Sequence, residues 1–90
     1  MSDADAQPLD APTARAVLEY LARSIVDDPD AVRVEVEAGG RGDLTLNLHV
    51  AEGELGRVIG KRGRVAQSIR TIVRAAAVRD DVTVGIEFVD

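Results

Sequence analysis

Apolar and polar residues alternate along three segments of the chain, which predicts three half-buried strands. In residues 31–38 (AVRVEVEA) a valine occupies every second position, and residues 44–50 (LTLNLHV) repeat the pattern with three leucines and a valine. The glycine-rich stretch GGRGD between them predicts a turn, so these two strands are expected to form a hairpin. The third segment is residues 82–89 (VTVGIEFV), whose expected core-facing side chains are Val82, Val84, Ile86 and Phe88.

The segment before these strands repeats its apolar residues at helical spacing. We expect a helix that begins at Pro12, with Asp10 or Thr13 as its cap, and ends before Pro29, which cannot continue a helix. The first 11 residues are rich in Asp, Ala and Pro and predict a disordered acidic tail, which leaves a folded domain over residues 12–90. The helix side chains expected to be buried are Val17, Leu18, Leu21, Ile25 and Val26.

Two more helices are predicted between the second and third strands. Residues 52–59 form a short helix at most, and a longer one runs from residue 64 to about residue 79. Three strands with one apolar face and helices to cover it indicate a two-layer α+β domain. Because a helical crossover joins the second and third strands, they should be parallel if they are neighbours. The expected inward residues are Leu55, Val58 and Ile59 in the short helix and Val65, Ile69, Ile72, Val73 and Ala76 in the longer one.

The net charge of −5 conceals one strongly basic segment. Between Arg57 and Arg79 the chain has seven Lys or Arg residues and no Asp or Glu, so this segment carries +7 and the remainder −12. A block of one sign produces a local field that the net charge hides. A solvated basic helix face is the alternative, but such faces ordinarily intersperse Glu with Arg. The distribution therefore favours an anion-binding surface.

Composition argues against several other classes of protein. There is no cysteine, and hence no disulfide or thiolate-bound metal. No apolar run approaches the roughly 20 residues that span a bilayer, and the acidic N-terminus is unlike a signal peptide, so a cytoplasmic protein without membrane contact is expected. The lone His49 lies on the polar face of its strand without a second ligand, and the serines have no evident base partner. We therefore expect no enzymatic activity, metal, cofactor or small-molecule substrate.

The basic segment begins with GRVIGKRGR, residues 56–64. A nucleotide-binding GxxxxGK[ST] loop would need Gly and Ser or Thr where the chain has Leu55 and Arg62, and a GxGxxG fingerprint fails at Val58. The remaining motif is GxxG, residues 60–63, with two cations between its glycines at the start of a helix. Free N–H groups and the helix dipole suit a phosphate there. A tight turn alone would explain the glycines but not the cations.

This loop and its surroundings resemble a KH domain, in which a GxxG loop joins two helices. The order α-β-β-α-α-β corresponds to the type II arrangement, a two-layer domain with a three-stranded mixed sheet covered by helices. The stretch DDPDAV after the first helix and the final IEFVD are similar to the small bacterial KhpA (YlqC-type) RNA-binding proteins. The resemblance covers residues 12–90.

The resemblance implies that the protein holds about four nucleotides of single-stranded RNA, with the loop on the backbone and the bases in an aliphatic groove. The only aromatic residues are Tyr20 and the core-facing Phe88, so no base stacking on aromatic side chains is expected. Helical phase places Arg70, with Gln67 and Arg74, opposite the buried stripe, where they either extend the phosphate track or only solubilise the helix. The expected RNA-binding residues are Gly56, Arg57, Ile59, Gly60, Lys61, Arg62, Gly63, Arg64, Val65 and Arg70.

The resemblance also implies partners and a cellular role. Members form homodimers and pair with a larger KH protein, KhpB, and act as RNA chaperones or post-transcriptional regulators linked to cell-wall homeostasis and cell shape. A weakly apolar strip of Thr71, Ala75 and Val78 is either a dimer face or a set of scattered surface residues. The alternative function is a KH-fold protein-interaction module with little RNA binding, which the two loop cations oppose.

Overall fold

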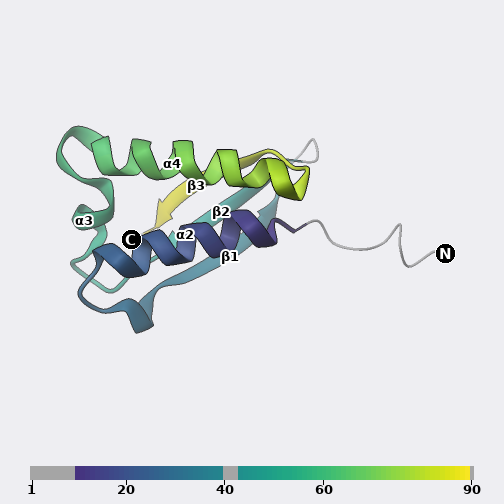
Figure 1. Ribbon diagram of the computed structural model, residues 1–90. Helices are drawn as coiled ribbons and strands as arrows, with labels where there is room; N and C mark the ends of the chain where they lie inside the picture. Colours follow the sequence, from purple (N-terminus) through teal and green to yellow (C-terminus); the bar gives the residue numbers. More distant parts are fainter. Residues whose placement is uncertain (1–9, 40–42, 90) are drawn as a thin grey trace.

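The computed structural model describes residues 10–39 and 43–89. The first nine residues of the predicted tail, which covers residues 1–11, and the centre of the predicted hairpin turn lie outside these residues and stay predictions. The element order agrees with the predicted type II KH arrangement (Figure 1). The elements are α2 (Pro12–Ile25), η1 (Pro29–Ala31), β1 (Arg33–Ala38), β2 (Leu44–His49), α3 (Leu55–Ile59), η2 (Lys61–Gly63), α4 (Arg64–Ala77), η3 (Val78–Asp80) and β3 (Val84–Val89).

The three strands form a mixed sheet in the order β1-β2-β3. β1 and β2 are antiparallel, with Val34 opposite Leu48, and β2 and β3 are parallel, with Leu46 opposite Ile86. The predicted alternation therefore places the leucines of β2 and the first apolar residues of β3 on one buried face. The polar residues of the strands occupy the other face, where His49 contacts Glu35 at 3.0 Å.

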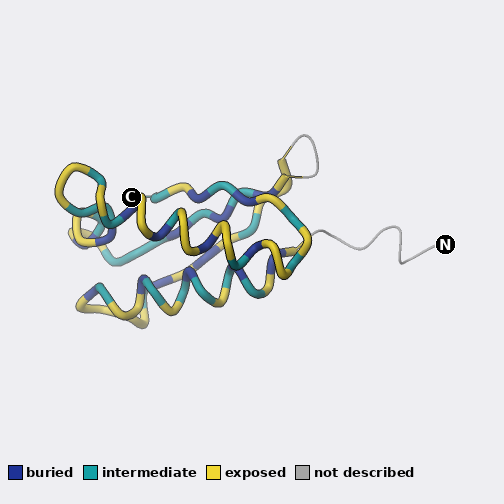
Figure 2. Tube along the Cα trace, turned by 45° about the horizontal axis from the view of Figure 1, so that its top comes forward, coloured by how far each residue is buried: buried dark blue, intermediate teal, exposed yellow. Residues whose placement is uncertain are grey.

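α2 and α4 lie side by side over the buried face of the sheet (Figure 1). The dark positions in Figure 2 mark the core between these two layers. α3 and the GxxG loop sit at one end of the molecule, next to the C-terminal end of β3 (Figure 1). This arrangement brings the loop, the start of α4 and the end of β3 together. The largest fully buried side chains are Leu18, Leu44, Leu46, Leu48, Val58 and Val73.

The buried stripe of α4 differs from the predicted one. Ile72 was expected in the core, but its side chain is 47% exposed. The stripe is rotated because it includes Ala66 and Ala77, small residues of a helix that packs against α2, which itself buries Ala14 and Ala22. Small side chains allow two helices to approach closely, and these positions carry little weight in a pattern of large apolar residues. The buried residues of α4 are Ala66, Ile69, Val73 and Ala77.

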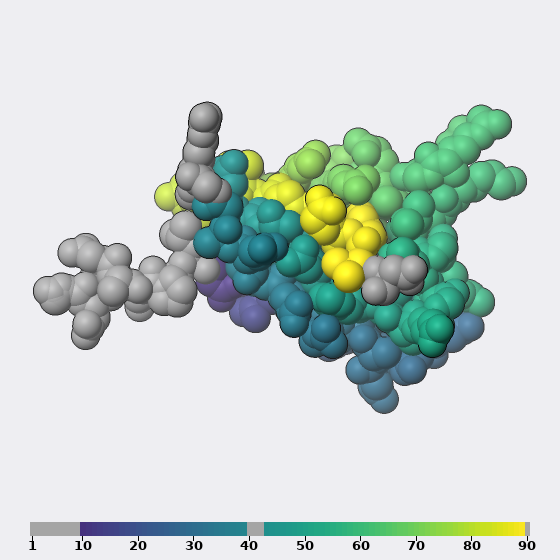
Figure 3. Space-filling model, turned by 180° about the vertical axis from the view of Figure 1, so that it is seen from behind, coloured from purple at the N-terminus to yellow at the C-terminus, as the bar shows by residue number. Residues whose placement is uncertain are grey.

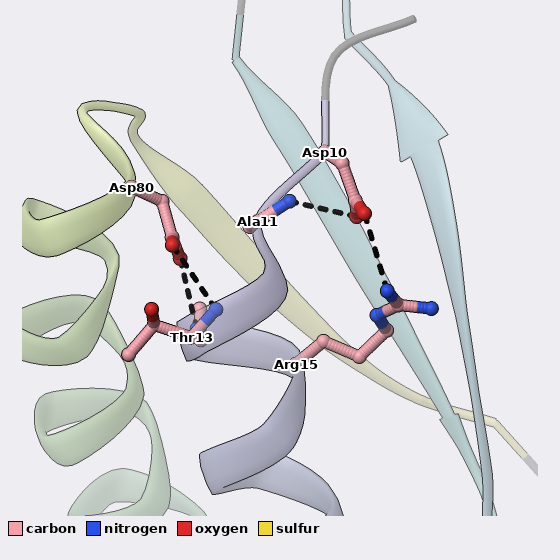
Figure 4. Close-up of polar contacts among 6 residues, drawn as sticks. Asp10, Ala11, Thr13, Arg15 and Asp80 are labelled. Atoms are coloured by element: carbon pink, nitrogen blue, oxygen red, sulfur yellow. Dashed lines mark hydrogen bonds and ion pairs between the residues drawn. The ribbon is translucent and has the colours of Figure 1, made fainter.

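The start of α2 is capped by a residue from the far end of the chain. Asp80 in η3 accepts hydrogen bonds from the backbone amides of Thr13 and Ala14 at 3.0 and 2.9 Å (Figure 4). The prediction that Asp10 or Thr13 caps this helix is therefore wrong, since the residue at the cap position, Ala11, provides no side-chain bond. Asp10 instead accepts from the amide of Ala11. The cap fastens α2 to the turn between α4 and β3.

We predict that Asp80→Ala lowers the free energy of unfolding by about 1–2 kcal/mol at pH 7, the usual value of a helix cap. Partial burial raises the pKa of Asp80, but the amides of Ala14 and Thr13 and the Thr13 hydroxyl together hold that pKa below its ordinary value of 3.8. A carboxylate with a depressed pKa stabilises the fold above its unfolded-state pKa and loses this effect as the pH falls through the folded-state pKa. Urea unfolding at pH 7 and pH 3 measures both effects.

Asp81→Asn is the matched control for this prediction. Asp81 follows Asp80 directly, is exposed and has a positive φ of 58°, which asparagine tolerates as well as aspartate. The control should leave stability within about 0.5 kcal/mol of the starting protein. An Asp80→Ala variant with the same stability as the control would contradict the assignment of the cap.

Candidate nucleic-acid interface

The GxxG loop is a tight turn built on left-handed backbone angles. Gly60, Arg62 and Gly63 have φ angles of 77°, 59° and 72°. The amide of Gly60 donates to the carbonyl of Gly56 at 2.9 Å, and the amide of Gly63 donates to the carbonyl of Gly60 at 3.1 Å. Glycine adopts such angles without a steric penalty at residues 60 and 63, whereas Arg62 has a left-handed angle that is uncommon for a residue with a β-carbon.

Gly60 is also held by close packing against the first turn of α4. A β-carbon built on Gly60 would lie 2.8 Å from the Val65 β-carbon and 3.0 Å from the Val65 amide nitrogen. At Gly56 and Gly63 an added β-carbon would meet nothing within 4 Å. Gly60 is therefore required by the fold, whereas the other two glycines leave open space beside the main chain.

The cations of the loop project into solvent. Lys61 and Arg62 are exposed, and the green segment near residue 60 extends away from the body of the molecule in two places (Figure 3). Among the described residues no side chain caps the start of α4, although the amide of Arg64 donates to the carbonyl of Lys61. Within residues 10–39 and 43–89, no carboxylate lies within 4 Å of the charged groups of Lys61, Arg62, Arg64, Arg70, Arg74 or Arg79.

Arg57 differs from the other basic residues because it has acidic partners. Its guanidinium lies 3.1 Å from a carboxylate oxygen of Asp27 and 3.8 Å from one of Glu54. The Glu54 side chain is buried and accepts hydrogen bonds from the amides of Asp27 and Asp28 at 2.5 and 2.9 Å. α3 begins at the next residue, so Glu54 ties the helix before the loop to the turn after α2. Sequence reasoning missed this contact.

Arg70 lies on a different side of α4 from the one that the sequence predicted. Its side chain is partly buried at the edge of the α4 stripe and its guanidinium carbon lies 5.0 Å from the centre of the Phe88 ring. The prediction that Arg70 faces away from the core is therefore wrong, because the stripe is rotated towards it. Phe88 packs against the core as predicted but stays partly exposed at the end of β3.

The structure places the other predicted site residues on one continuous path from α3 through the loop into α4. Gly56 and Arg64 are exposed, while Ile59 and Val65 are partly buried beneath the loop. A separate hollow of about 290 Å³ lies on the outer side of α4 and is lined by Gln67, Ser68, Thr71 and Ile72. The described part of the chain holds no group of three or more His, Cys, Asp or Glu placed to bind a metal ion.

A family model described as KhpA/KhpB, KH domain, matches residues 15–88. The chain belongs to this KhpA/KhpB family. It is 44% identical over 75 residues to the RNA-binding protein KhpA of Clostridium acetobutylicum, covering 83% of this chain and 99% of that one. The KhpA of Chlamydia trachomatis is 37% identical over 73 residues, covering 81% of this chain and 92% of that one. The KhpA relatives are named as RNA-binding proteins and not as enzymes, which agrees with the sequence-based expectation.

Solved structures with this fold include two of Era. The crystal structure of an Aquifex aeolicus Era variant bound to GDP·AlF4⁻ has a TM-score of 0.59 and 18% identity, covering 91% of this chain and 31% of Era. Era in complex with MgGDPNP and nucleotides 1506–1542 of 16S ribosomal RNA has a TM-score of 0.57 and 19% identity, covering 91% of this chain and 30% of Era. The chain thus spans about a third of each Era chain, and the likeness shows the KH-type fold. In the described ranges no helix has the length and apolar character needed to cross a membrane.

Proposed function

We propose that this KhpA-family chain binds single-stranded RNA through the loop of Gly60, Lys61, Arg62 and Gly63. The main support is that the loop combines a left-handed glycine backbone with two exposed cations that lack carboxylate partners among the described residues. The sugar-phosphate backbone lies over the loop and the uncapped start of α4, and the bases lie towards α3 and β3. The names of the KhpA relatives support this proposal.

The positions of the acidic residues indicate on which side of the loop the RNA lies. Asp27 and Asp28 are exposed at the α2 side of α3, and Asp27 already pairs with Arg57. A phosphate near these carboxylates would be repelled, while the first turns of α4 present cations without described partners. We therefore place the RNA along the loop and α4. In this arrangement Arg57 is a rim residue whose charge is shared with Asp27.

Removing the two loop cations tests the proposal. We expect Lys61→Gln/Arg62→Gln to weaken binding of a labelled single-stranded RNA at least about tenfold, since each charge-assisted hydrogen bond is worth about 1.5–3 kcal/mol. The slope of log affinity against log salt should fall by about 1.4, or about 0.7 for each lost phosphate contact. Fluorescence anisotropy at several salt concentrations provides both values.

Arg23→Gln/Arg33→Gln is the matched control. These two arginines are exposed on α2 and β1, and their removal changes the net charge by the same amount. The control should keep the affinity and salt slope of the starting protein. Unchanged RNA affinity in a folded loop variant would instead favour the protein-interaction module.

We propose further that the exposed apolar side chains of α4 and η3 form a self-association face. Val78 is 76% exposed and Ile72 47% exposed, and the hollow beside Thr71 adjoins Ile72. By helical spacing Thr71 and Val78 lie on one side and Ile72 about a quarter-turn away, and exposed apolar residues that adjoin in this way commonly mark contact surfaces. We expect Ile72→Glu/Val78→Glu to weaken dimerisation about tenfold or more in sedimentation velocity. Ala16→Glu, at an exposed position of α2, is the control and should not change dimerisation. A starting protein that is monomeric in the same experiment would contradict the proposal.

The cellular role proposed with this activity is that of a cytoplasmic RNA chaperone or post-transcriptional regulator. It includes pairing with a KhpB-type partner and a link to cell-wall homeostasis and cell shape. Membership of a family named for both KhpA and KhpB supports the partnership. Co-purification with the KhpB-type protein of the same cell, with and without the α4 substitutions, tests it.

A further inference from the structure

Arg70 and Phe88 form a contact that neither RNA phosphate binding nor core packing requires. The guanidinium carbon of Arg70 lies over the Phe88 ring, 5.0 Å from its centre. Both side chains are partly exposed. In the described residues no carboxylate lies within 4 Å of Arg70, so the aromatic ring is the group that holds its guanidinium in place.

Phe88 lies near the loop end of the sheet, and Arg70 reaches it from the middle of α4. Arg70 follows Arg64 by six residues, a rise of about 9 Å along α4. Arg70 is partly buried at the edge of the buried stripe, and its guanidinium reaches Phe88 of β3. Phe88 is near the C-terminal end of β3, which lies next to α3 (Figure 1). For a base to contact this pair, an RNA strand whose backbone crosses the loop has to extend about 9 Å along α4.

We propose that Arg70 and Phe88 together form a stacking platform for one nucleobase of the bound RNA. The inference rests on the proposed function, and assigns to Arg70 a base contact in place of a phosphate contact. A guanidinium plane stacks on a base as aromatic rings do, and arginine is used in this way in RNA recognition. In the proposed platform one face of the guanidinium lies against Phe88 and the other receives the base.

The ring prepares the guanidinium for this contact. A free arginine side chain loses rotamer freedom when it stacks on a ligand, which reduces affinity. A side chain already held over an aromatic ring has less freedom to lose. Because every base has a planar face, the platform accepts any nucleobase, and a sequence-tolerant contact of this kind suits a small domain that holds few nucleotides. The scarcity of aromatic residues makes this one contact more important.

The platform is tested by substitutions that remove a planar group but keep the charge or the apolar character of the side chain. Arg70→Lys keeps the positive charge but removes the planar group, and Phe88→Leu keeps an apolar side chain but removes the ring. The probe is a short labelled single-stranded RNA, together with versions that carry 2-aminopurine or an abasic site at each position in turn. Arg74→Lys, one turn further along α4 at an exposed position, is the matched control.

We expect both variants to weaken binding of the intact RNA about five- to a hundredfold, the range expected for the loss of one stacked base. The salt slope should stay unchanged in Arg70→Lys, because no charge is lost. At one position the fluorescence of 2-aminopurine should change on binding to the starting protein and not on binding to Arg70→Lys. An abasic site at that position should be bound equally by the two proteins, and Arg74→Lys should behave as the starting protein.

Any one of three results would overturn the platform. The first is that Arg70→Lys binds the intact RNA as tightly as the starting protein, and the second is that it loses the same affinity on every abasic RNA. The third is that its salt slope falls as it would for a lost phosphate contact. If Lys61→Gln/Arg62→Gln weakens binding while Arg70→Lys does not, the proposed function stands and the platform falls alone. If the starting protein binds no RNA, both fall. Should Phe88→Leu unfold, Arg70→Lys decides the test, because its side chain contributes little to the core.

Discussion

Replacing Gly60 by alanine is expected to lower the free energy of unfolding by about 2–5 kcal/mol, the largest effect of any single methyl group added to the loop. Two independent costs contribute. The backbone angles of Gly60, φ 77° and ψ 173°, belong to a region that is accessible almost only to glycine. In addition, the new β-carbon would lie 2.8 Å from the β-carbon and 3.0 Å from the amide nitrogen of Val65.

The second cost cannot be relieved by a side-chain rotation. The atoms of Val65 that the new methyl group meets include its main chain, so relief requires a shift of the first turn of α4. That turn carries the N–H groups proposed to hold a phosphate. We therefore expect Gly60→Ala to weaken RNA binding more than tenfold, even at temperatures where the variant remains folded. Urea unfolding and RNA titration of the same samples measure the two effects.

Gly56→Ala and Gly63→Ala provide graded controls for this prediction. Gly56 is helical and an added methyl group meets open space, so the change should stabilise the protein by about 0.4–1 kcal/mol. Gly63 has open space beside it but a left-handed backbone, so Gly63→Ala should lower the free energy of unfolding by about 1 kcal/mol. Equal stability of the Gly60 and Gly63 variants would show that the contact with Val65 does not constrain the loop.

The elements and the position of the loop could be predicted because they depend on local rules. Alternation with a period of two places leucines 44, 46 and 48 on one face, and that face must be buried against something. The loop was recognised because a chain that turns sharply between two helices needs glycine where φ is positive, as at Gly60 and Gly63. Each of these signals is contained within a few consecutive residues of the chain.

The contacts that join distant segments could not be predicted in this way. Asp80 and Ala14 are 66 residues apart, and Glu54 and Asp27 are 27 apart. A carboxylate that accepts a hydrogen bond from a backbone amide requires no particular residue at the donor, so no spacing in the sequence reveals it. The rotation of the α4 stripe was missed for a related reason, because alanines at a helix contact look neutral in a pattern of apolar residues. The same rotation placed Arg70 against Phe88.

We expect Glu54→Ala to lower the free energy of unfolding by about 2–4 kcal/mol, because each hydrogen bond to a charged acceptor is worth about 1.5–3 kcal/mol and the two are not fully additive. The Glu54 carboxylate is 10% exposed and accepts from the amides of Asp27 and Asp28. Without it, both amides lose their acceptor and Arg57 loses its second carboxylate partner. Guanidinium chloride unfolding measures the loss.

Two further variants show whether the effect comes from the Glu54 carboxylate or from the loss of side-chain volume. Glu54→Gln has nearly the same shape, but its amide oxygen can accept only one of the two bonds while its NH2 group faces the other donor. It should therefore retain less than half of the contribution. Glu52→Ala, at an exposed position two residues earlier, should change stability by no more than about 0.5 kcal/mol. A glutamine variant as stable as the starting protein would show that these bonds do not hold α3 in place.

The effect on RNA binding follows from the position of Glu54 immediately before α3. The bonds to Asp27 and Asp28 fix the start of a helix of five residues, and the GxxG loop begins where that helix ends. Loss of this anchor releases the loop from one side while the packing of Gly60 on Val65 persists. We expect affinity for single-stranded RNA to fall several-fold in Glu54→Gln with an unchanged salt slope, since all phosphate-binding cations remain. A reduced slope would instead place Glu54 among the determinants of the phosphate contacts themselves.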